Sequence, residues 1–137
     1  MEIIQATKQP VPTIPYTLPP IPYLILGLNK PRQQLNQLID KRVDLRLKQG
    51  MIPEVKRLLK SGITHKRLQN FGLEYKYISL YLQNHLTKEE MIAQLKNAIH
   101  KFAKRQMTWW KRDGRIHWIK NQTQAEKLIK NFINSHG

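Results

Sequence analysis

The segment from Thr87 to Arg112 constrains the fold of this chain most, because it predicts one long amphipathic helix. Thr87-Lys-Glu-Glu90 is a capping box, in which a hydroxyl and a carboxylate three residues later satisfy free amides at a helix start. Helical spacing then gathers the apolar side chains on one face. That face is expected to hold Met91, Leu95, Ile99, Phe102 and Trp109, flanked by Ile92 and Trp110. Tryptophans in such positions are more often core residues than base-stacking platforms, and although these two lie on different sides of the helix, the sequence assigns a stacking role to neither.

The opposite face of the same helix is expected to be basic and polar. It carries Lys96, Asn97, His100, Lys101, Lys104, Thr108 and Lys111, with few acidic residues to balance them. A charged helix face is usually a solvated surface, but the whole chain has 24 lysines and arginines against 9 acidic residues, a net charge of +15. Such an excess favours a polyanionic partner, by default nucleic acid. The alternative is a structural basic protein of ribosomal type.

Two polar residues interrupt faces that are otherwise apolar. Gln106 falls at the centre of the apolar stripe, where its amide either bonds a neighbouring backbone group in the core or reaches into a site. Arg42 falls within the apolar face that Leu35, Leu38 and Ile39 define on an earlier helix. A guanidinium there needs an anion, which is either a phosphate or diphosphate ligand or a structural carboxylate.

The remaining sequence predicts a mainly α-helical chain with one or two short strands. Residues 23–28 form an apolar run typical of a buried strand, and residues 115–119 alternate as a short strand does. Helices are expected over 31–49 with Asn29 as cap, from Pro53 to Gly62, over 73–83 and over 123–134, with a turn of helix or irregular structure at 64–71. A short helix at 2–8 and a connector with six prolines over 10–22 form a first unit, residues 1–22, before the helical unit at 23–137.

Several kinds of site and location are disfavoured by what the sequence lacks. There is no cysteine, hence no disulfide or thiolate metal site, which is compatible with a reducing cytoplasm. The five histidines show no metal-ligand spacing, and no Gly-Lys-Ser or Gly-Lys-Thr phosphate loop is present. No apolar run approaches the roughly 18 residues of a membrane span, so no membrane partner is expected.

Several blocks of the sequence, in their order and spacing, resemble one family. They are Glu2-Ile-Ile-Gln-Ala-Thr-Lys-Gln-Pro10, Ile25-Leu-Gly-Leu28 leading to Pro31-Arg32, Ile39-Asp-Lys-Arg-Val-Asp44, Gln49-Gly-Met-Ile-Pro-Glu-Val-Lys56, Phe71-Gly-Leu-Glu-Tyr75 and, most specifically, Ala103-Lys-Arg-Gln-Met-Thr-Trp109. Together they resemble the C-terminal portion of bacterial tRNA dimethylallyltransferases (tRNA isopentenyltransferases). The resemblance implies a P-loop-type α/β transferase with a helical insertion. Such enzymes move a dimethylallyl group from its diphosphate to N6 of adenosine 37 of tRNA, a base extruded from the anticodon loop.

The resemblance also implies roles for particular residues. Lys104 to Lys111 matches a segment that contacts tRNA, so we expect Lys104 and Arg105 to bind phosphates and Thr108 and Lys111 to add contacts. Lys101 and Gln106 are candidates beside them. Gly72 belongs to a second tRNA-contacting segment, in which Leu73 and Glu74 replace the usual tyrosine and base. Arg42 matches an arginine that binds the diphosphate, whereas Leu38 stands where another arginine is common.

The family's phosphate loop, its general-base aspartate and most of its Mg²⁺ ligands are expected in an N-terminal half that this sequence does not contain. The chain is therefore expected to be a fragment without catalytic residues of its own, inactive alone, that supplies tRNA contacts. The alternative is a free-standing helical RNA-binding module without catalysis. The strand at 23–28 would expose an apolar edge, which invites self-association.

Overall fold

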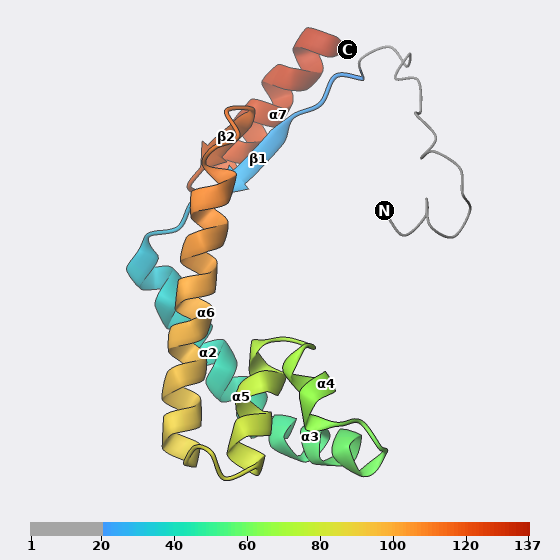
Figure 1. Ribbon diagram of the computed structural model, residues 1–137. Coiled ribbons are helices and arrows are strands. Elements are labelled where there is room, and N and C mark those ends of the chain that lie inside the picture. Colours follow the sequence, from blue (N-terminus) through green and yellow to red (C-terminus); the bar gives the residue numbers. More distant parts are fainter. Residues whose placement is uncertain (1–20) are drawn as a thin grey trace, which may run out of the picture.

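The structure is a computed structural model that describes residues 21–137, so the helix expected at 2–8 and most of the proline-rich connector lie outside it. Its elements are β1 (Ile25–Leu28), α2 (Arg32–Lys48), α3 (Met51–Lys60), α4 (His65–Gln69), α5 (Leu73–Leu82), α6 (Lys88–Trp110), β2 (Ile116–Ile119) and α7 (Gln122–His136). The described chain is thus mainly helical with two short strands, as the sequence predicted, and the helix boundaries agree closely (Figure 1).

Helix α6 is the long axis of the molecule and begins with the predicted capping box. The Glu90 backbone N–H donates to Thr87 Oγ1 at 3.2 Å, and the Thr87 N–H donates to the Glu90 carboxylate at 2.8 Å. The bond from the Thr87 backbone holds the pKa of the Glu90 carboxyl below its usual value. Helix α2 lies alongside α6, while α3, α4 and α5 gather at the N-terminal end of α6 and the strands and α7 lie at its C-terminal end (Figure 1).

The hydrophobic core lies among α3, α4, α5 and the start of α6. Its buried members are Met51, Val55, Leu68, Ile78 and Met91. Ser79 is also fully buried, and its hydroxyl is 2.8 Å from His65 Nδ1, which satisfies its hydrogen-bonding capacity. This compact group anchors the N-terminal end of α6, so the other end of the helix projects away from the main core.

The two strands pair in parallel at that other end. Ile25 lies opposite Ile116, and Leu28 lies opposite Ile119. A Cβ atom on Gly27 would lie 2.6 Å from Ile116 Cγ2 and 2.7 Å from Trp118 Cε3, so only glycine allows this close approach. Parallel strands need a long connection, and here helices α2 to α6 provide it.

Two predictions about this region are wrong. The run at 23–28 does form a strand, β1, but this strand is half-buried instead of buried, because it has one neighbouring strand in the described structure and leaves Leu28 exposed. Asn29 does not cap α2: Pro31 occupies the N-cap position, and no side-chain hydrogen bond is made there. The Asn29 backbone N–H instead donates to the Ile119 carbonyl at 2.8 Å, which prolongs the strand pairing by one residue.

Within residues 21–137, no helix combines the length and the apolar content that crossing a bilayer requires.

Candidate nucleic-acid interface

The second half of α6 exposes most of the side chains that the sequence singled out. Met91 and Leu95 are buried and Ile99 is half-buried, as predicted. Beyond Ile99 the predicted apolar face is wrong, because Phe102 is 45% exposed and Trp109 is 62% exposed. The helix has left the main core by this point, and it is Ala103, Met107 and Trp110 that line a pocket with β1 and β2.

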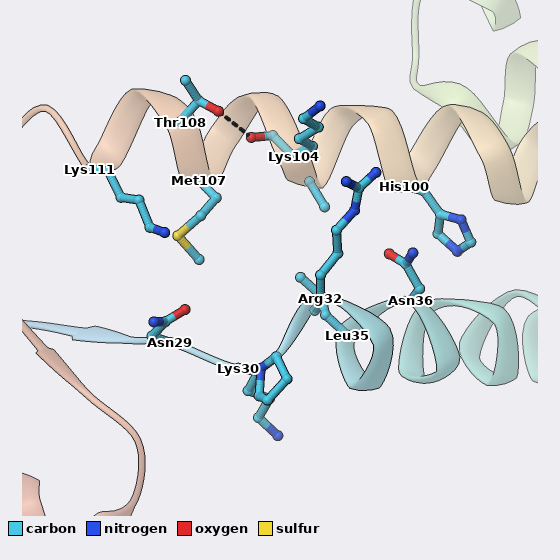
Figure 2. A pocket seen from close by; sticks show the side chains of 12 residues that line it. Asn29, Lys30, Arg32, Leu35, Asn36, His100, Lys104, Met107, Thr108 and Lys111 are labelled. Carbon is cyan, nitrogen blue, oxygen red and sulfur yellow. Dashed lines mark hydrogen bonds between the residues drawn. The ribbon is translucent and has the colours of Figure 1, made fainter.

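A cleft lies between α6 and the segment that leads into α2. We call it the α2–α6 cleft; it encloses about 320 Å³ and is lined by Asn29, Lys30, Pro31, Arg32, Leu35, Asn36, His100, Ala103, Lys104, Met107, Thr108 and Lys111 (Figure 2). In Figure 2 the Arg32 side chain extends from α2 toward α6, and Lys111 extends from α6 toward Asn29. No aspartate or glutamate is among these lining residues. Cations from two segments far apart in the sequence therefore meet in one place.

A second, shallower hollow lies on the outer side of α6. It is lined by Lys101, Lys104, Arg105, Thr108, Trp109 and Arg112. Because Lys104 and Thr108 line both concavities, the two join into one continuous area. We call this area the basic surface and define it by Lys30, Arg32, Lys101, Lys104, Arg105, Lys111 and Arg112. The Thr108 hydroxyl donates to the Lys104 carbonyl at 3.0 Å, so its oxygen can still accept a hydrogen bond from a ligand.

The prediction that the basic face lacks balancing acids is wrong at its N-terminal end. Lys96 Nζ is 2.8 Å from a carboxylate oxygen of Asp44, and His100 Nε2 is 2.8 Å from Asp40. Two carboxylates one turn apart on α2 thus face two bases one turn apart on α6. Beyond His100 the situation changes, because no member of the basic surface forms an ion pair with another residue in 21–137. The second half of α6 and the segment that leads into α2 therefore present neighbouring cations without acidic partners in the described chain.

The other predicted site residues meet on a different side of α6. Arg42, Gly72 and Gln106 line a pocket of about 480 Å³ with Leu35, Ile39, Val43, Leu73, Glu74, Ile99, Phe102 and Ala103. The Arg42 side chain is 71% exposed, and its Nη2 lies 4.0 Å from Glu74 Oε1, the outer limit of an ion pair. Arg42 therefore lies beside the apolar face of α2 and not within it, because the face turns toward the buried Val43 and leaves Leu38 exposed.

The structure speaks against one of the two interpretations of Gln106, that of a core glutamine. A core glutamine would be buried and bonded, but the Gln106 side chain is exposed and has no hydrogen-bond partner within the described chain. It lines both the pocket beside Arg42 and the pocket beside Gly27. The core interpretation is wrong, and the amide is available to a ligand.

Lys30, Arg32 and Arg112 were not singled out from the sequence as site residues. A signal was nevertheless present, since Lys30-Pro-Arg32 places two cations at the start of a helix whose first turn contains no acidic residue. Helix N-termini carry partial positive charge and favour acidic side chains, so cations there are unfavourable unless an anion joins them.

No metal site is indicated in the described part of the chain. Residues 21–137 contain no cluster of three or more histidine, aspartate or glutamate side chains that could hold an ion.

An ion pair closes the turn after α6 and makes the stability of the fold depend on pH. Arg115 Nη2 lies 2.7 Å from Asp113 Oδ2, and Arg115 Nε donates to Asp113 Oδ1 at 2.8 Å. These bonds lower the pKa of the Asp113 carboxyl to about 2. Because the folded pKa lies below the ordinary value of 3.8, ionised Asp113 stabilises the fold above about pH 4, and this contribution is lost as the pH falls toward 2.

We therefore expect the Asp113 carboxyl carbon to titrate near pH 2 in an NMR experiment. In the Arg115→Gln variant the midpoint should return toward the ordinary aspartate range, because the guanidinium that holds the carboxylate is gone. An unchanged midpoint in the variant would show that another group lowers the pKa.

Comparison with known proteins agrees with the resemblance seen in the sequence. The sequence model of the IPP transferase family matches residues 1–113. tRNA dimethylallyltransferase 1 of Parabacteroides distasonis is 42% identical over 80% of this chain and 37% of its own length, and tRNA dimethylallyltransferase 2 of Phocaeicola vulgatus is 43% identical over 85% of this chain and 39% of its own length.

Solved structures give the same result for the fold. The full-length tRNA isopentenylpyrophosphate transferase of Bacillus halodurans superposes with a TM-score of 0.71 at 32% identity, over 98% of this chain and 42% of that chain. The corresponding enzyme of Staphylococcus epidermidis gives a TM-score of 0.71 at 28% identity, over 83% of this chain. The chain belongs to the IPP transferase family. It spans 37–41% of the length of the first curated relatives that it matches.

Proposed function

We propose that this chain is the tRNA-binding portion of a tRNA dimethylallyltransferase, which transfers a dimethylallyl group from dimethylallyl diphosphate to N6 of adenosine 37. The observation that carries the proposal is the basic surface, whose cations come from two walls and have no acidic partners within residues 21–137. The names of the relatives, which are tRNA dimethylallyltransferases, supply the substrate class. Such an enzyme would act in the cytoplasm, where its tRNA substrates are found.

The shape of the basic surface suits an RNA backbone. A strand that lies in the α2–α6 cleft meets Arg32 and Lys111, and one that continues over the outer side of α6 meets Lys101 and Arg105. Lys104 lines both concavities and so would contact phosphates in either part. Each phosphate that these cations neutralise releases condensed counterions, so binding should weaken steeply with salt.

The pocket beside Arg42 suits a smaller anion. We assign the guanidinium of Arg42 to the diphosphate of the prenyl donor, because its planar array of donors matches phosphate oxygens and its present contact with Glu74 is 4.0 Å long. Gly72 and Gln106 line the same pocket and would face the RNA that enters it. Residues 21–137 contain no cluster of three or more acidic or histidine side chains that could hold the Mg²⁺ that such transferases use with the diphosphate.

A second candidate function is RNA binding without catalysis by this chain alone. It is favoured by a basic surface that is present in a sequence without a Gly-Lys-Ser or Gly-Lys-Thr phosphate loop. Self-association is a related proposal, because Tyr23 and Leu28 beside the β1 edge are exposed.

The proposed function is tested by titrating a fluorescent anticodon stem-loop with this chain at several salt concentrations. The logarithm of the affinity should fall linearly with the logarithm of the salt concentration, by about 0.7 to 0.9 per phosphate contacted. An affinity that does not depend on salt would contradict the role of the basic surface. Transfer of a labelled dimethylallyl group to the same RNA is assayed in parallel; we expect binding without product, and product from this chain alone would place the catalytic groups within it.

A further inference from the structure

Trp109 is exposed in the outer hollow of the basic surface. Its side chain is 62% accessible, against 48% for Trp110, and the hollow around it is lined by Lys101, Lys104, Arg105, Thr108 and Arg112. A large aromatic ring gains free energy by leaving water, so an indole in this position is a ready contact for a ligand. The charged residues around Trp109 are all cationic, so they favour an anionic ligand.

Trp109 packs against its neighbour in the sequence, Trp110. The rings of Trp109 and Trp110 are perpendicular, with an interplanar angle of 85° and centroids 4.6 Å apart. A perpendicular contact uses the edge of one ring, so Trp110 covers at most one face of Trp109. Trp110 itself lines a pocket with Gly27, Ile116 and Trp118 of the strand pair. The Trp109 indole therefore contacts Trp110 on the side of the strand pair. One face of the Trp109 ring stays free to contact a ligand in the outer hollow.

We propose that Trp109 stacks on an unpaired base of the bound RNA while the surrounding cations hold its phosphates. This inference rests on the proposed function and adds a specific requirement for single-stranded RNA. A fully paired duplex presents phosphates but keeps its base faces stacked inside, and an acidic peptide presents carboxylates without flat rings. Only an unpaired nucleotide offers both a planar π-surface and a phosphate within the reach of one helix.

The test compares two RNAs of equal charge, a hairpin with an unpaired loop and a fully paired duplex. The Trp109→Ala variant should bind the hairpin about 5- to 150-fold more weakly, which is the range for loss of one stacked base. The slope of affinity against salt should not change, because no phosphate contact is removed, and duplex binding should not change. The Trp109→Phe variant keeps an aromatic ring and should retain most of the affinity for the hairpin.

The matched control is Ile133→Ala, which removes an exposed apolar side chain from α7, outside the basic surface. This control should leave hairpin affinity unchanged. A second readout does not depend on Trp109→Ala being well folded: loop RNA should quench the tryptophan emission of the unsubstituted chain, and Trp109→Phe should lose most of this quenching.

The outcomes separate this inference from the function on which it rests. Salt-dependent binding of the hairpin that Trp109→Ala does not weaken, or an equal loss for hairpin and duplex, would overturn the stacking role and leave the basic surface in place. Quenching that persists in Trp109→Phe would also overturn it. Failure of the unsubstituted chain to bind either RNA would instead contradict the proposed function.

Discussion

Replacing Lys104 by glutamate is expected to weaken binding of the anticodon stem-loop about 10- to 100-fold, close to the range for losing one charge-assisted contact of about 1.5–3 kcal/mol. Lys104 lines both the α2–α6 cleft and the outer hollow, so its reversal places a negative charge where the two join. The slope of affinity against salt should also become shallower by about one. Fluorescence titration over a range of salt concentrations measures both effects.

The matched control is Lys56→Glu, which makes the same charge change at an exposed position on α3, outside the basic surface. Both variants lower the net charge by two, so a general effect of charge would weaken binding equally in each. We expect Lys56→Glu to change the affinity by less than about threefold, because charges beyond a Debye length of about 8–10 Å are largely screened. Equal losses in the two variants would mean that total charge, and not the basic surface, determines binding.

Replacing Leu68 by alanine is expected to lower the free energy of unfolding by about 2–5 kcal/mol. Leu68 is fully buried and is the only buried residue of the short helix α4, which it joins to α3, α5 and α6. The substitution removes buried apolar surface and leaves a cavity that the rigid neighbours fill only in part. Since small domains are stable by only about 5–15 kcal/mol, the variant should unfold at a clearly lower urea concentration.

The same chemical change at an exposed site provides the comparison. Leu45→Ala on α2 removes a side chain that already faces solvent, so it should change the stability by about 0.5 kcal/mol or less. Urea unfolding followed by circular dichroism measures both variants. If Leu45→Ala were as destabilising as Leu68→Ala, Leu45 would be covered in solution and the position of the core would need revision.

Much of the fold was predictable because its signals are local. The capping box at Thr87 fixed the start of α6, and Gly50 and Gly62 marked helix ends where the backbone has positive φ. The alternation at 115–119 predicted β2 correctly. These features depend on residues within one turn or one strand of each other, so a single sequence contains them.

The errors arise where a distant segment decides the outcome. Periodicity divides α6 into an apolar and a polar face. Which part of the apolar face is covered depends on the elements that pack against it. Strands β1 and β2 lie beside Met107, whereas Trp109 stays exposed. The bond between Asp40 and His100 spans sixty positions, and no local pattern indicates it. Asn29 is not a cap for a similar reason, since its backbone continues the strand pairing with Ile119 and the helix begins only after Pro31.

The sequence predicted residues of the candidate site better than it predicted how they are arranged in space. The segment around Lys104 was identified from its residues and its resemblance to a family, whereas the opposing wall with Arg32 required the packing of α2 against α6. The roles of Arg42, Gly72 and Gln106 stay predictions, although the structure places all three around one pocket.

The paired carboxylates of α2 have a consequence for where RNA can lie. Asp40 and Asp44 face the middle of α6, and carboxylates repel a phosphate, so they form an electrostatic border between the two ends of the helix. A 23-residue helix is roughly 35 Å long, which separates the anchoring core from the end that we propose binds RNA. Substitutions at one end should therefore have little effect on the other. Those in the core should change the stability of the fold, and those beyond the border should change the affinity for the proposed RNA.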